Sequence, residues 1–129
     1  MYQIVRNHVV EDLQIRDNDK ELVLHVDINV DNVLGQYATA AKVLADAQAA
    51  VNSGITEEKL NALHSAIKGV FTVVFGDKQM HQIEEFYGGS YTEMLADVAP
   101  FVNDVVAPKI NEAQQRIIEK YKNVKRFKK

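Results

Sequence analysis

The sequence predicts an α+β fold that is predominantly α-helical, with an N-terminal β-hairpin followed by four or five helices. Apolar residues alternate with polar ones before residue 30 and recur every three or four residues after it, which are the periods of a strand and of a helix. Glycines and prolines punctuate the helical part, and the last helix is expected to be long and proline-kinked. We expect a single domain over 1–129, with the hairpin in 1–30 and the helices in 31–126.

Two apolar runs predict the hairpin. Leu13 and Ile15 alternate with polar residues in the first run, and the second run alternates in the same way at Leu22, Leu24, Val26 and Ile28. Between them, Asp17-Asn18-Asp19-Lys20 forms a turn signal, because Asn and Asp tolerate left-handed backbone. A lone hairpin is marginal in water, so its apolar face is expected to pack on the helices. Residues 2–10 are expected to extend the first strand.

The first helix is predicted over 32–52. Asp31 or Asn32 is expected to cap it, and one face carries an apolar stripe made of Leu34, Tyr37, Ala41, Leu44 and Val51. Asn52-Ser53-Gly54 is a stop signal, because glycine readily takes the left-handed conformation that ends many helices.

Thr56 is expected to begin the next helix, whose apolar stripe is Leu60, Leu63, Ile67, Val70 or Phe71, and Val74. Residues 70–75 are rich in strand-forming side chains. No turn signal separates them from the preceding helical pattern, so we predict helix there. Gly76 is expected to end this helix, and Asp77 to cap a short one that runs to about Tyr87.

Gly88-Gly89 is expected to stop that short helix, and Ser90 with Glu93 has the pattern of a capping box. The apolar stripe that follows consists of Leu95, Val98, Val102 and Val105, and then of Ile110, Ala113, Ile117, Tyr121 and Val124. Pro100 and Pro108 interrupt it. Each lacks a backbone N–H, so each is expected to kink or break the helix.

The composition is ordinary for a folded domain and carries no catalytic motif. Hydrophobic residues make up 47% and charged residues 26%, and the absence of cysteine excludes disulfides and thiolate sites. The four histidines lie outside the spacings of zinc-binding helices, although His81 has Glu84 and Glu85 one turn away. No apolar run approaches the ~18 residues of a membrane helix, and the first residues lack a signal-peptide layout. We expect no enzymatic activity, cofactor, metal or membrane partner.

Charge is unevenly distributed along the chain. Residues 109–129 hold eight Lys and Arg residues against two Glu, a balance of +6, and the net charge of −3 leaves −9 for residues 1–108. The basic tail at 120–129 is typical of a solvated, fraying helix end, because cations suit the negative end of a helix dipole. Docking to nucleic acid is the alternative, but the acidic remainder would repel phosphates.

Four stretches in the second half resemble a known family. Phe75-Gly76-Asp77, then the residues FYGGSY at 86–91, then MLADVAPFVNDVVAP at 94–108 and the Lys-rich end resemble tail assembly chaperones of phages and prophages of Gram-positive bacteria. The resemblance covers roughly residues 60–129.

The resemblance implies a non-enzymatic protein in the cytoplasm of the bacterial host. Such chaperones coat the tape measure protein, recruit tail tube subunits and leave the finished virion. It also implies a short form, extended in some relatives by ribosomal frameshifting, and self-association into dimers or rings. Two alternatives stay open: a structural tail or virion accessory protein, and a nucleic-acid-associated accessory protein that uses the basic tail.

A protein that holds a partner helix needs apolar surface beyond its own core. The helices predicted at 32–52 and 91–126 have more amphipathic length than a small core requires. The candidate partner-binding residues lie on the last helix and its basic end: Ile110, Ile117, Lys120, Tyr121, Lys122, Lys125, Arg126, Lys128 and Lys129.

Overall fold

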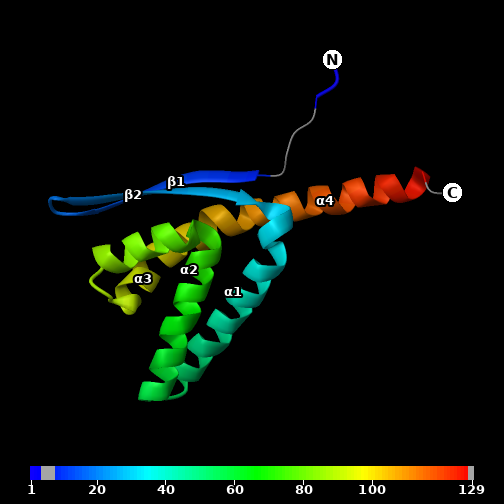
Figure 1. The fold of residues 1–129 in the computed structure, drawn as a ribbon. Helices are drawn as coiled ribbons and strands as arrows, with labels where there is room; N and C mark the ends of the chain where they lie inside the picture. Colours follow the sequence, from blue (N-terminus) through cyan, green and yellow to red (C-terminus); the bar gives the residue numbers. More distant parts are fainter. Residues whose placement is uncertain (4–7, 128–129) are drawn as a thin grey trace.

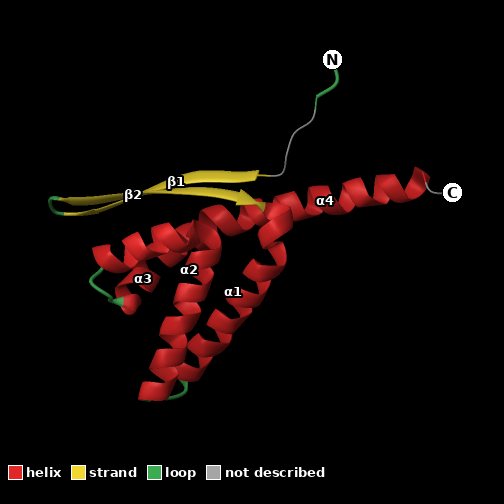
Figure 2. Cartoon of the chain, viewed as in Figure 1, coloured by secondary structure: helices red, strands yellow, loops and turns green. Residues whose placement is uncertain are grey.

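The computed structural model describes residues 1–3 and 8–127, with no side chains described beyond Lys122. Its elements follow in the order β1 (His8–Asp17), β2 (Lys20–Asn29), α1 (Val30–Asn52), α2 (Glu57–Phe86), α3 (Tyr91–Phe101), the π-helical segment η1 (Val102–Val106) and α4 (Ala107–Phe127), as Figure 1 shows. The two strands form an antiparallel hairpin that lies across one side of the helices (Figure 2). The fold is α+β and predominantly helical, as predicted. Because α3, η1 and α4 follow one another without a loop, the number of helices depends on how this run is divided.

The hairpin turns where the sequence predicts it. Asn18 takes left-handed backbone with a φ of 53°, and Asp17 is paired with Lys20 across the turn. The helix-facing side buries Val9, Leu24, Val26 and Ile28 and partly buries Leu13, Ile15 and Leu22. The first strand was expected to extend over residues 2–10. Strand is observed from His8 onward, and residues 4–7 lie outside the described residues.

α1 starts two residues earlier than predicted. The expected cap at Asp31 or Asn32 is wrong, because Asn29 is the N-cap and its side chain accepts a hydrogen bond from the Asp31 N–H at 3.2 Å. The predicted start of α2 at Thr56 is confirmed, since the Thr56 hydroxyl accepts a hydrogen bond from the Lys59 N–H at 3.1 Å. α1 and the first half of α2 lie side by side and project away from the hairpin (Figure 1).

α2 is helical through residues 70–75 and then turns at Gly76, as predicted. Gly76 has a φ of 84° and a ψ of 164°, which interrupts the helix. The side-chain amide of Gln79 donates to the Phe75 carbonyl at 2.8 Å. This carbonyl lies at the end of the first half of α2 and would otherwise lack a helical partner. The turn sets the second half of α2 against β2.

α3, η1 and α4 bury a stripe in which residues recur every four positions: Met94, Val98, Val102, Val106 and Ile110. Of the predicted stripe, Val98 and Val102 are buried and Leu95 packs against the core, whereas Val105 is only partly buried. Steps of four residues drift about 40° around an α-helix. In η1 the Ala107 N–H bonds to the Val102 carbonyl five residues back, and this wider turn opposes the drift.

The helix after Gly88 and Gly89 starts where the sequence predicts, but it lacks the predicted capping box. Ser90 is the N-cap of α3, but it makes no side-chain cap hydrogen bond, so the predicted capping box with Glu93 is wrong. The Ser90 N–H, which Glu93 would have bound, donates instead to the Tyr87 carbonyl at 3.1 Å. Neither proline opens a loop: Pro100 lies inside α3 and Pro108 near the start of α4.

Most buried apolar side chains belong to one cluster, which we call the body. It joins the hairpin, residues 66–86 of α2 and residues 91–113 of the α3–η1–α4 run. α1 contributes one fully buried residue to it, Val30 at the end of β2. The rest of the apolar face of α1 packs at the margin of the body and stays partly exposed.

Candidate functional site

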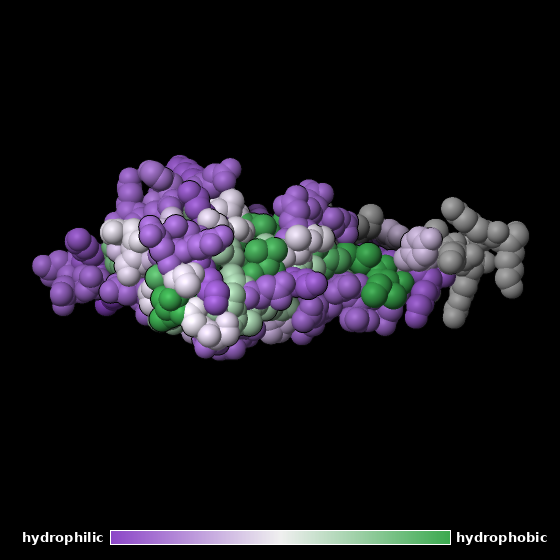
Figure 3. Space-filling model, turned by 90° about the horizontal axis from the view of Figure 1, so that it is seen from below, coloured by the Kyte–Doolittle hydropathy of each residue, from purple (hydrophilic) through white to green (hydrophobic). Residues whose placement is uncertain are grey.

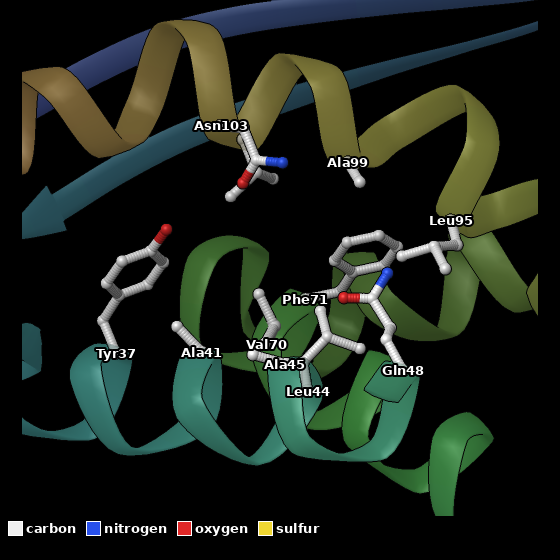
Figure 4. A pocket seen from close by; sticks show the side chains of 11 residues that line it. Tyr37, Ala41, Leu44, Ala45, Gln48, Val70, Phe71, Leu95, Ala99 and Asn103 are labelled. Carbon is white, nitrogen blue, oxygen red and sulfur yellow. The ribbon is translucent and has the colours of Figure 1, made fainter. Parts of the chain in front are cut away.

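An apolar cavity of about 200 Å³ lies between α1 and the α3–η1 run, with α2 as its floor (Figure 4). α1 supplies Tyr37, Ala41, Leu44, Ala45 and Gln48, α2 supplies Val70 and Phe71, and the opposite wall consists of Leu95, Ala99, Val102 and Asn103. We call it the α1 cavity.

Local periodicity places these side chains on facing walls. Tyr37, Ala41 and Leu44 follow one another at steps of four and three residues, so they share one face of α1. Leu95 and Ala99 are spaced in the same way on α3. In Figure 4 the α1 side chains point toward α3 and η1, and Ala99 and Asn103 point back toward α1.

Polar groups stand at the margins of the α1 cavity and apolar groups line its middle. Tyr37 and Asn103 lie toward one end, and the Gln48 amide lies toward the other, beside Leu95 (Figure 4). Burial raises the pKa of the Tyr37 hydroxyl above its usual value, so it stays a neutral hydrogen-bond donor at physiological pH. A few polar groups around an apolar surface are the usual arrangement of a binding site.

Exposed apolar side chains also lie outside the α1 cavity. Seen from below, apolar side chains are visible between polar ones over the middle of the molecule (Figure 3). On α1, Val43 is 51% exposed, and Ile55 in the following loop is 72% exposed.

Those predicted site residues that the structure describes lie on α4, away from the α1 cavity, and the predicted residues divide into three groups. Ile110 is 1% exposed and belongs to the core, so its predicted place on a binding surface is wrong in this structure. Ile117 packs at the edge of the core, whereas Tyr121, Lys120 and Lys122 are exposed. The side chains of Lys125, Arg126, Lys128 and Lys129 lie outside the described part of the chain.

Sequence reasoning missed the α1 cavity as a site, although its signal was present. The apolar stripe of the first helix was recognised, but the sequence does not say which of its residues the body covers. The end of α4, by contrast, projects beyond the strands (Figure 1). Its exposed residues include Ile118 and Tyr121, both apolar or aromatic.

The histidines form separate contacts with single carboxylates or aromatic rings. His8 contacts Asp27 at 2.8 Å and His25 contacts Asp12 at 2.6 Å, on the solvent side of the hairpin. On the helices His81 contacts Glu85 at 3.1 Å, and the ring of His64 stacks on that of Tyr91 with centroids 5.0 Å apart. Within residues 1–3 and 8–127, no group of three or more His, Asp or Glu residues is arranged to hold a metal ion.

A second hollow lies where the hairpin turn approaches α3, and it is polar. It is lined by Ile15, Arg16, Asp17, Phe86, Tyr87, Glu93 and Asp97. The Tyr87 hydroxyl donates to Asp97 at 3.0 Å, and burial, this bond and the surrounding carboxylates raise the pKa of Tyr87 far above its usual value. Nearby, the Tyr91 hydroxyl donates to Glu84, and this bond, followed by burial, raises the pKa of Tyr91 to about 12.

No protein-family model, curated protein or solved structure matches the chain. None of the described helices combines the length and the apolarity that crossing a membrane requires.

Proposed function

We propose that this protein is a non-enzymatic tail assembly chaperone of a phage or prophage, which binds an amphipathic helix of the tape measure protein in the α1 cavity. The single observation that carries the proposal is the apolar lining of that cavity between α1 and the α3–η1 run. The resemblance of residues 60–129 to this family supports the choice of partner. Tape measure proteins are long and helical, so they offer such a ligand.

Helix-in-groove recognition accounts for the arrangement physically. A bound helix presents apolar side chains at spacings of three and four residues, which insert between Leu44 of α1 and Leu95 of α3. Tyr37, Gln48 and Asn103 at the margins then offer hydrogen bonds that fix its register. Because most of α1 contacts the body only at its margin, α1 can move apart to admit the ligand.

The finer shape of the α3–η1–α4 wall belongs to the same proposal. We propose that Pro100 and Pro108, which flank η1, bend this run so that it curves along the bound helix. The exposed basic residues Lys120 and Lys122 on α4 then face an acidic partner, for which the tail tube protein is our candidate.

Two neighbouring residues of α1 test the binding site. The expected result is that Leu44→Arg, which places a charge in the α1 cavity, abolishes co-purification with the co-expressed tape measure protein. Val43→Arg puts the same charge on the exposed side of α1 and is expected to leave co-purification unchanged. Circular dichroism checks that both variants fold. Equal binding by both variants would contradict the site.

The composition of finished particles tests the class of protein. A chaperone is expected to be absent from purified virions. Stoichiometric presence there would overturn the proposal in favour of the structural accessory protein. Binding of mixed-sequence DNA that weakens steeply with salt would instead favour the nucleic-acid-associated alternative.

A further inference from the structure

The two edges of the hairpin are treated differently by the rest of the molecule. On β2, the His25 N–H donates to the Gln79 side chain at 2.8 Å, and the Gln79 amide donates to the His25 carbonyl at 2.7 Å. One side chain of α2 therefore occupies both backbone groups at the middle of that edge. On β1, no described residue bonds to the outward backbone groups.

The ladder register identifies which groups of β1 are free. Hydrogen-bonded and non-hydrogen-bonded pairs alternate along an antiparallel pair. His25 turns its backbone groups outward, so its partner Asp12 does the same on the other side. This outward orientation recurs at every second residue along β1, so Val10, Gln14 and Arg16 also turn their backbone groups outward. These four residues present unpaired N–H and C=O groups along one edge.

β1 lacks two of the features that prevent an edge from pairing, proline and a bulge. It spans ten residues without proline, and its register with β2 runs without a bulge. The charge that faces the helices, Glu11, is paired with Lys109 of α4. Leu13 and Ile15 are only partly buried, so a strand laid beside β1 would cover more of their surface.

We propose that the β1 edge is a self-association surface, on which β1 of a second copy pairs antiparallel to form a four-stranded sheet. Charge complementarity selects the occupant and the register. With Gln14 opposite Gln14 of the partner subunit, Asp12 lies opposite Arg16 of the partner subunit, and the reverse pair forms by symmetry. In this register Leu13 lies opposite Ile15 of the partner subunit, and Glu11, whose charge is paired by Lys109 of α4, lies opposite Asp17 of the partner subunit. The Asp12 side chain contacts His25 yet remains 69% exposed, which leaves room for this second contact. This inference does not depend on the proposed function.

A matched pair of proline variants tests the edge, with sedimentation velocity over a concentration series of the purified full chain. Proline removes a backbone N–H, and edge positions tolerate it when that N–H faces outward. Gln14→Pro is expected to turn a dimer into a monomer. Val23→Pro, at the residue paired with Gln14 but on the β2 edge, is expected to remain dimeric. The proposal is overturned if the unmodified chain stays monomeric at every concentration, or if Gln14→Pro leaves the dimer intact.

Charge variants test the register without introducing a proline into the strand. Asp12→Arg and Arg16→Asp each place like charges opposite each other, so each alone is expected to raise the dimer dissociation constant at least about tenfold. An equimolar mixture of the two variants restores both opposite-charge pairs and is expected to form a heterodimer. A mixture that associates no more tightly than either variant alone would rule out this register.

Discussion

α1 and the buried stripe of α3, η1 and α4 are both amphipathic helices, yet they differ in what covers their apolar faces. The stripe from Met94 to Ile110 is buried by the hairpin and by α2, and each of its residues is at most 2% exposed. Along α1, only Val30 is buried to that degree. Similar sequence patterns thus serve packing in one region and leave surface for binding in the other.

The difference follows from where each helix enters the fold. The α3–η1–α4 run passes beneath the hairpin, so three elements close over its apolar face (Figure 1). α1 leaves the end of β2 and projects with the first half of α2, so α2 is its main neighbour. The apolar side chains of α1 that face α3 then line a cavity instead of a closed core.

The largest expected effect is a large-to-small substitution in the body. Ile83 of α2 is fully buried, so Ile83→Ala removes buried methyl groups and leaves a cavity, and it should lower the free energy of unfolding by roughly 3 kcal/mol. Leu44→Ala on α1 should cost only about 1 kcal/mol, because its side chain is partly exposed. Urea denaturation measures both. Equal losses would remove the distinction between the body and α1.

Replacing a glycine by alanine should lower stability in the body and raise it in α1. Gly76 has a φ of 84°, so Gly76→Ala forces a side chain into left-handed backbone and should destabilise the body by about 1 kcal/mol or more. Gly35 lies inside α1 with open space around it, so Gly35→Ala should stabilise by about 0.5–1 kcal/mol. Thermal unfolding of the two variants checks the signs. A stabilising Gly76→Ala would mean that the turn in α2 is not required.

The smallest effect is a pH dependence in the body. The pKa of Tyr91 is raised to about 12 in the folded chain from a usual value of 10.0. The folded state therefore holds this proton more tightly, and the contribution to stability is complete below pH 10 and is lost as the pH rises through about 12. Tyr91→Phe should flatten the loss of stability between about pH 10 and about pH 12 in urea titrations, relative to the unmodified chain. An unchanged slope would show that the bond to Glu84 does not form in solution.

Much of the fold could be predicted because its signals are local. The turn at Asn18, the cap at Thr56 and the break at Gly76 each depend on the backbone preferences of one or two residues. Residues 70–75 were correctly predicted as helix because no turn signal preceded them, despite their strand-forming side chains. The capping box at Ser90 failed because a carbonyl outside the motif, that of Tyr87, already accepts the Ser90 N–H.

The candidate site was less predictable, because exposure depends on which faces meet. Ile110 and Tyr121 lie on the same predicted stripe, but one is in the core and the other is 62% exposed. The difference arises because the hairpin and α1 cover only the first part of α4. The hydrogen bonds between Gln79 and His25 join residues 54 positions apart, and no local sequence pattern at either residue predicts them.

By itself the sequence determined the types of the elements, their order and most of their ends, since these follow from residue periodicity and from the backbone preferences of glycine, asparagine and threonine. Only the tertiary structure decided which apolar stripe became core, where η1 widens the helix, and which hairpin edge is covered. Periodicity says that a residue lies on an apolar face. What covers that face is set by contacts between distant segments, and these contacts separate the body from the α1 cavity and the β1 edge.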